Sequence, residues 1–158
     1  MAMRKALEVL GSEETLGPTI ARMAAEEGME APSVGVEQIR ATTASLELVE
    51  KRGLVKYPYV QVSCERVVNA LREKFRRFSG TARIGVEIRC SGERLEEVEA
   101  ESRLLADALA EVLENNRGDW GEGFSYAGGY ELVHLPAKAG GRNIVQTVKA
   151  TFDLDVSV

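Results

Sequence analysis

The clearest pattern along the chain is an alternation of apolar and polar residues at its end. From Ile144 to Val158 nearly every second residue is apolar, and the residues between them are mostly Thr, Lys and Asp. Residues 81–90 alternate in the same way, with Ala82, Val86 and Cys90 on the apolar side. Successive side chains of a strand leave opposite faces, so both segments are predicted strands with one buried face. A sheet with one polar face predicts an α+β fold, an antiparallel or mixed sheet with helices packed on one face.

Two further segments have weaker patterns. Val60 to Cys64 alternates after Tyr57-Pro58 and predicts a short strand. Residues 67–78 are ambiguous, because Val67, Leu71, Phe75 and Phe78 have helical spacing while alternation around Glu73 also fits an edge strand. We expect a helix there, ended by a turn at Ser79-Gly80.

Helical patterns occupy the beginning and the middle of the chain. The strongest apolar stripe runs from about Glu93 to Asn116, with glutamates in its first turns. Residues 1–53 are predicted to form an N-terminal helical segment, with one helix from about Pro18 to Glu27 and another from about Val36 to Arg52. Residues 54–158 form the α+β part, and we expect the two parts to make one compact unit. No stretch resembles a signal peptide or approaches the ~20 apolar residues of a membrane span, so no membrane partner is expected.

Charge is distributed unevenly along the chain, whose net charge is −5. Residues 65–89 contain seven basic and three acidic side chains, whereas residues 93–122 contain ten acidic and three basic ones. The acidic total argues against a general nucleic-acid binder. Such polarity suits head-to-tail or ring-like self-association, although solvated charged faces explain it equally well.

Residues with catalytic potential are few and isolated in sequence. His134 is the only histidine, and Cys64 and Cys90 lack a CxxC partner, so redox and zinc motifs are absent. The two cysteines could form a disulfide, but two buried thiols in a reducing compartment are the favoured interpretation. The glycines of residues 118–123 follow a helix rather than a strand, and no Gly-Lys-Ser/Thr occurs. We therefore expect no catalytic residues, no metal site, no cofactor and no enzymatic activity.

Two groups of side chains are candidates for a protein interface. Trp120, Phe124 and Tyr126 lie in the glycine-rich segment 116–129, where they are either interface anchors or a small core folded back onto the sheet. A basic run could contact phosphate or an acidic neighbouring subunit, and the acidic total favours the protein partner. The basic run consists of Arg72, Lys74, Arg76 and Arg77.

Four stretches carry a resemblance to a known family. They are YPYVQVSCERVVNALREKFRRFSG, RIGVEIRCSGERLE, NNRGDWGEGFSYAGGYEL and GGRNIVQTVKATFDLDV, in this order. Residues 57–158 thereby resemble the tail-completion or tail-terminator (neck) proteins of long-tailed phages and prophages. These stretches contain, in order, a proline-containing strand, a second strand, a long helix, a glycine loop and a final hairpin. This order looks like the compact α+β subunit of that family.

The resemblance implies a structural role in virion assembly. It implies a ring, commonly of six copies, that caps the tail tube and joins it to the head-side connector or stopper protein, with DNA passing transiently through the lumen. Its location would be the tail-neck region of the virion, after synthesis in the cytoplasm of the host bacterium.

Three alternatives stay open at this point. The chain could be a head–tail connector or stopper instead. It could be a small-ligand enzyme, if a pocket held His134 beside Glu131 or Asp119. It could also contact DNA through the basic segment of residues 66–89.

Overall fold

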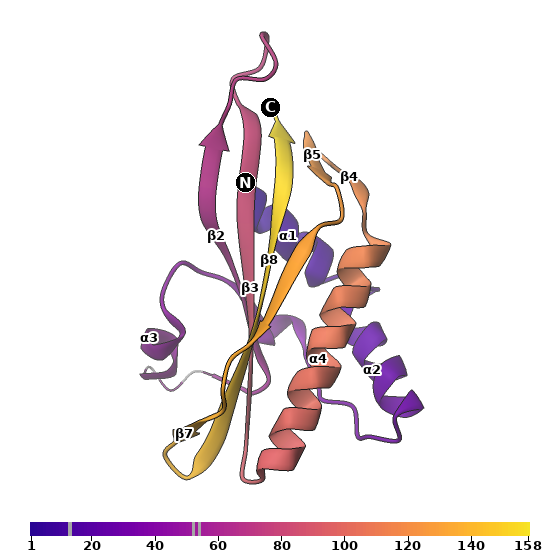
Figure 1. The fold of residues 1–158 in the computed structure, drawn as a ribbon, viewed down its shortest axis with the longest axis vertical. Coiled ribbons are helices and arrows are strands. Elements are labelled where there is room, and N and C mark those ends of the chain that lie inside the picture. Colours follow the sequence, from indigo (N-terminus) through magenta and orange to yellow (C-terminus); the bar gives the residue numbers. More distant parts are fainter. Residues whose placement is uncertain (13, 52, 54) are drawn as a thin grey trace.

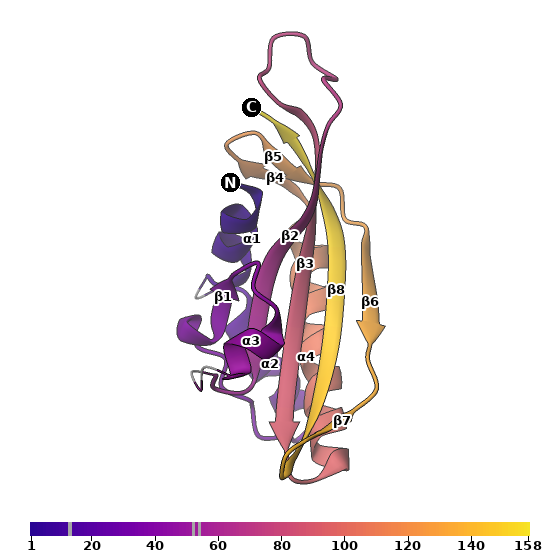
Figure 2. The same cartoon turned by 90° about the vertical axis from the view of Figure 1, so that its left-hand side faces the viewer.

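A single curled sheet organises the part of the chain that the computed structural model describes, residues 1–12, 14–51, 53 and 55–158 (Figures 1 and 2). Its eight described strands have the order β1-β2-β3-β8-β5-β4, and β6 and β7 also pair with β8. The strands are β1 (Ile39–Ala41), β2 (Tyr59–Asn69), β3 (Ser79–Gly92), β4 (Gly118–Gly121), β5 (Phe124–Tyr126), β6 (Tyr130–His134), β7 (Lys138–Gly140) and β8 (Asn143–Ser157). The helices are α1 (Ala2–Leu10), α2 (Leu16–Glu26), α3 (Leu46–Lys51) and α4 (Leu95–Asn115), with a 3₁₀ turn at Val36–Gln38.

The two strands with the strongest alternation form the centre of this sheet. β3 and β8 pair antiparallel over their whole length, from Ser79 opposite Ser157 to Gly92 opposite Ile144. Their apolar positions face the same side and are buried, as Ile84 and Phe152 illustrate. Because β1 runs parallel to β2 while the other pairs are antiparallel, the sheet is mixed and the predicted α+β class is confirmed.

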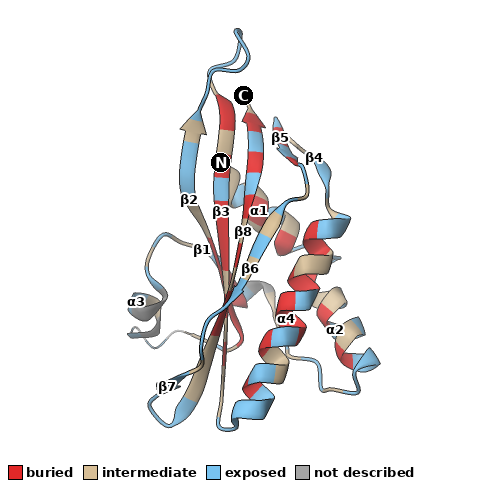
Figure 3. Cartoon of the chain, viewed as in Figure 1, coloured by how far each residue is buried: buried red, intermediate tan, exposed pale blue. Residues whose placement is uncertain are grey.

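Helices α1, α2 and α4 cover the apolar face of the sheet (Figures 1 and 3). Leu10 and Ile20 of the first two helices belong to the same buried cluster as Leu109 of α4 and Val86 of β3. Residues 1–53 therefore contribute to the core that the sheet and α4 share. α2 ends near the predicted position, with Gly28 in the left-handed region after it at φ 68°. No helix within the described residues is both long and apolar enough to cross a membrane.

The prediction of a helix over residues 67–78 is wrong. β2 continues to Asn69, the chain turns through residues 70–78, and β3 begins at Ser79. Val67, Leu71 and Phe75 have helical spacing, but all three are exposed. Since no surface lies beneath such a stripe, cross-strand hydrogen bonds between β2 and β3 decide the local structure.

The predicted helix over residues 36–52 is also wrong for most of its length. Val36–Gln38 forms a 3₁₀ turn, and Ile39–Ala41 pairs with the edge of β2 as β1. The helix α3 begins only at Leu46, and the predicted end at Arg52 lies outside the described residues. The Oγ1 of Thr42 accepts a hydrogen bond from the amide of Ala44 at 3.0 Å, which favours a turn over a helix between β1 and α3.

The opposite face of the sheet is largely polar and open. Arg83 pairs with Asp153 through two hydrogen bonds of 2.9 and 3.0 Å, and Lys149 pairs with Glu65 at 2.6 Å. Part of this face is buried, because Tyr59, Gln61 and Thr147 lie on it and are little exposed. The Nε2 of Gln61 donates to the carbonyl of Ala44 at 2.8 Å. Packing on one side is thus confirmed for most of the sheet.

Candidate interaction site

The turn between β2 and β3, residues 70–78, projects beyond the end of the sheet, and we call it the hairpin tip (Figures 1 and 2). Phe75 is 101% exposed at this turn, and Leu71 is 64% exposed. Large exposed apolar side chains that lie together commonly mark a surface for a partner. The hairpin tip is therefore the first candidate for an interaction surface.

The base of the hairpin tip is held by specific contacts. The Oδ1 of Asn69 accepts hydrogen bonds from the amides of Leu71 and Ser79, both at 3.2 Å. A Cβ at Gly80 would lie 1.8 Å from the carbonyl oxygen of Val68, so the two strands approach this closely only because residue 80 is glycine. Leu71 adopts a positive φ of 46°, an uncommon conformation for its side chain. These contacts fix the direction in which the tip leaves the sheet.

The hairpin tip is also strongly basic. Arg72, Lys74, Arg76 and Arg77 outnumber Glu73, which gives a local charge of +3 from four positive and one negative side chain. Arg72 pairs with Asp155 at 3.4 Å and Arg76 with Glu73 at 3.5 Å, and all four of these side chains are at least half exposed. Such exposed pairs contribute little to stability. The basic side chains of the tip can therefore leave these partners and pair with acidic side chains of another protein.

An apolar groove of about 420 Å³ lies at the base of the hairpin, on the helix-covered side of the sheet. The first turn of α1 forms one wall and β5 forms the other. Its lining residues are Met1, Ala2, Met3, Cys64, Val67, Phe78, Ala82, Phe124, Val156 and Val158. No local pattern predicts this groove, because its walls come from distant segments of the chain.

The predicted aromatic candidates lie mainly inside the molecule. Phe124 and Tyr126 are 2% and 1% exposed, so they do not present the surface expected of interface anchors. Trp120 is partly buried, with its ring centroid 5.6 Å from that of Tyr126 and 6.0 Å from that of Phe152. Its Nε1 donates to the carbonyl of Asn116 at 2.6 Å. Of the two interpretations, the small core folded onto the sheet describes these aromatics, and only Phe124 also lines the groove.

The isolated residues with catalytic potential do not converge. His134 and Glu131 are both exposed and stand three positions apart on β6, so their side chains leave opposite faces. Asp119 lies on β4, where its Oδ1 accepts the amide of Gly121 at 2.7 Å. Among the described residues no group of three or more His, Cys, Asp or Glu side chains is arranged to hold a metal ion.

The cysteines are unpaired, and Cys90 is buried beside Glu101. Burial raises the pKa of the Cys90 thiol strongly, and burial also raises the pKa of the Glu101 carboxyl. A thiol with a raised pKa stays protonated at neutral pH and is a poor nucleophile. Cys64 is partly buried and faces the groove.

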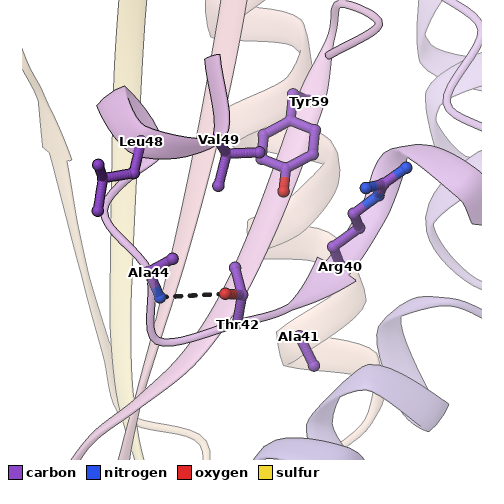
Figure 4. Close-up of a pocket in the computed structure, with 7 residues that line it drawn as sticks. All are labelled: Arg40, Ala41, Thr42, Ala44, Leu48, Val49 and Tyr59. Carbon is purple, nitrogen blue, oxygen red and sulfur yellow. Dashed lines mark hydrogen bonds between the residues drawn. The ribbon is translucent and has the colours of Figure 1, made fainter. Parts of the chain in front are cut away.

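A second hollow of about 400 Å³ lies beneath α3 (Figure 4). Its walls are formed mainly by Leu48, Val49 and the ring of Tyr59, and Arg40 is the charged side chain among the described residues that line it. Burial raises the pKa of the Tyr59 hydroxyl, and the nearby positive charge of Arg40 opposes this increase.

Comparisons with known proteins do not identify the chain. No protein-family model matches it, and no curated protein sequence matches it either.

Proposed function

We propose that this chain is a ring-forming structural subunit that completes the tail of a long-tailed phage or prophage. The single observation that supports an assembly role most strongly is the hairpin tip, whose fixed base holds Phe75 in full contact with water. Exposure of an aromatic ring on a constrained turn brings no benefit to an isolated molecule. It is useful when another protein covers that ring.

The distribution of charge supports head-to-tail contacts between copies. Basic side chains gather on the hairpin tip, whereas α4 carries acidic side chains on its exposed positions, including Glu97 and Glu114. A surface that meets a different surface of the next copy produces a ring when the rotation closes. Complementary charge would orient the copies as they approach each other.

The sequence resemblance of residues 57–158 indicates which assembly the chain would join, a ring at the end of a phage tail tube. In this proposal the ring binds the last subunits of the tail tube, prevents further polymerisation and then binds the head-side connector or stopper protein. No chemical step is required of the chain. A connector or stopper would use the same surfaces, and the position of the ring within the virion distinguishes the two roles.

The test combines solution mass with binding to tail tubes. We expect light scattering across a concentration series to show a closed species, near six times 17.2 kDa for a hexamer. Electron microscopy should then show the protein at one end of tubes assembled from the tube protein of the same phage or prophage. A species that stays monomeric and does not bind tube ends would refute the proposal. Binding to the head connector alone would favour the connector role, and steeply salt-dependent retention on DNA would favour a DNA-contacting role.

A further inference from the structure

We propose that the hairpin tip of one copy inserts into the apolar groove of a second copy, with Phe75 as the anchoring side chain. This inference rests on the proposed ring, and it specifies which two surfaces meet. Both surfaces are present once in each copy, so every tip has one groove to fill. The groove is otherwise open, and the tip is otherwise uncovered.

The shapes of the two surfaces agree. The groove has a volume of about 420 Å³, and the side chains that line it are apolar apart from the thiol of Cys64. Phe75 and Leu71 are the large apolar side chains that the tip exposes. The tip extends beyond the end of the sheet along the long axis of the molecule (Figure 2). Phe78 at its base lines the groove of its own chain, but Phe75 does not line that groove and is fully exposed. A second copy is therefore the occupant that the geometry favours.

Charge around the groove suits a basic tip. Exposed Asp119 and Glu122 belong to the β4–β5 hairpin, whose Phe124 lines the groove. On the opposite wall, Arg4 and Lys5 share one counterion, Glu8, at 3.7 and 3.1 Å. These five side chains carry three negative and two positive charges, a net charge of −1, so the +3 tip would approach side chains of opposite net charge.

The tip-in-groove contact buries little surface, and this small area predicts how assembly depends on protein concentration. An aromatic side chain buries roughly 150–250 Å², whereas a stable interface buries about 1,200–2,000 Å² in total. A single tip-in-groove contact is therefore weak, and closure of a ring adds a second contact for each copy. We expect assembly to be cooperative and to depend steeply on protein concentration.

A directional cross-linking experiment tests the inference. Cys64 lines the groove, and Cys90 is fully buried, so the groove already carries a single accessible thiol. One partner is the double variant Lys74→Cys with Cys64→Ser, which has a thiol beside Phe75 and none in the groove. The other partner is the unaltered chain. A short bifunctional maleimide should link the two proteins when they are mixed, and much less when the second partner carries Cys64→Ser.

Substitution of the anchor supplies an independent measurement. We expect Phe75→Ser to weaken self-association on the order of 30-fold, the loss typical of a central interface residue. Phe75→Leu should retain most of the association, because it remains apolar. Phe75 is exposed, so both variants should unfold at the temperature of the unaltered protein, which separates loss of assembly from loss of folding.

The outcomes separate this inference from the proposed function. Cross-linking only in the mixture, together with weaker assembly of Phe75→Ser, supports tip-in-groove contact. Rings that form normally from Phe75→Ser without the directional cross-link overturn this inference and leave the ring proposal intact. Absence of any assembled species, alone or on tail tubes, overturns both.

Discussion

Two hairpins at the same end of the sheet have aromatic side chains in or beside their turns. These side chains are buried in one hairpin and exposed in the other. The turn of the β4–β5 hairpin precedes Phe124 and Tyr126, which are both buried, and the ring of Tyr126 packs against that of Phe152. The hairpin tip between β2 and β3 carries Phe75, which is fully exposed. Composition alone suggested that both segments could form interfaces, but only the tip has a fully exposed aromatic side chain. Figure 3 shows the tip as an exposed segment.

The difference follows from backbone pairing. β5 pairs with β8, and the carbonyl of Gly123 accepts the amide of Ser157 at 2.8 Å, so alternate side chains of β5 face the core. The hairpin tip precedes Ser79, where the pairing of β3 with β8 begins. Only its base is attached to the sheet, through Phe78, which exchanges backbone hydrogen bonds with Val158, and Phe75 is fully exposed. An aromatic residue in a turn is thus an interface candidate only where no element of its own chain lies beneath it.

The largest expected effect is a difference in the free energy of unfolding between substitutions at two phenylalanines. Phe152→Ala should destabilise the protein by about 3–5 kcal/mol, because it leaves a cavity between Trp120 and Tyr126. Phe75→Ala should change the free energy of unfolding by less than about 0.5 kcal/mol. Urea denaturation monitored by circular dichroism measures both values. Equal destabilisation by the two substitutions would show that the tip packs against its own chain.

A smaller loss is expected at the base of the hairpin tip. Gly80→Ala places a Cβ 1.8 Å from the carbonyl oxygen of Val68, so the β2–β3 pairing must shift. We expect a cost of roughly 1–3 kcal/mol, typical of overpacking. Gly129→Ala is the matched control, because nothing lies within 4 Å of its added Cβ. Hydrogen exchange should localise the change to β2 and β3, and a Gly80→Ala variant as stable as the control would contradict the described geometry.

Charge reversal should affect assembly more than folding. The triple variant Arg72→Glu, Arg76→Glu and Arg77→Glu changes exposed side chains, so its melting temperature should stay within a few degrees of the original. Its assembly should be lost, because the tip would then repel an acidic neighbour.

Light scattering measures this loss against a control triple reversal at the opposite end of the molecule. The control variant carries Arg94→Glu, Lys138→Glu and Arg142→Glu. If both triple variants assemble like the unaltered chain, the basic run of the tip has no role in the interface.

The smallest effect concerns the polar face of the sheet. The hydrogen-bonded guanidinium of Arg83 lowers the pKa of the Asp153 carboxyl below its ordinary value. A lowered pKa in the folded state stabilises the protein above the unfolded pKa of about 3.9, and this contribution disappears as the pH falls through the folded value. Asp153→Asn should therefore be slightly less stable than the original at pH 7, and this difference should shrink as the pH falls below about 3.9. Thermal melts between these pH values measure the difference, and a constant gap would exclude this titration as its cause.

The sequence by itself determined the elements whose pattern agrees with their packing. β3, β8 and α4 were predicted within a few residues, because long alternating or helical stripes have one buried face whatever surrounds them. The α+β class and the open polar face followed from the same patterns. The basic run of residues 72–77 was also found from sequence, although its place on a projecting turn was not.

Tertiary structure alone decided the segments whose local patterns were weak or ambiguous. Residues 67–78 had helical spacing, but the first of them pair with β3 as part of strand β2. Leu71 and Phe75 lie beyond this pairing and are exposed. Residues 39–41 became a strand because the edge of β2 was available to them. The groove joins α1, β2, β3, β5 and β8, and a surface built from such distant segments exists only once the chain has folded, since no local pattern encodes which elements will become neighbours.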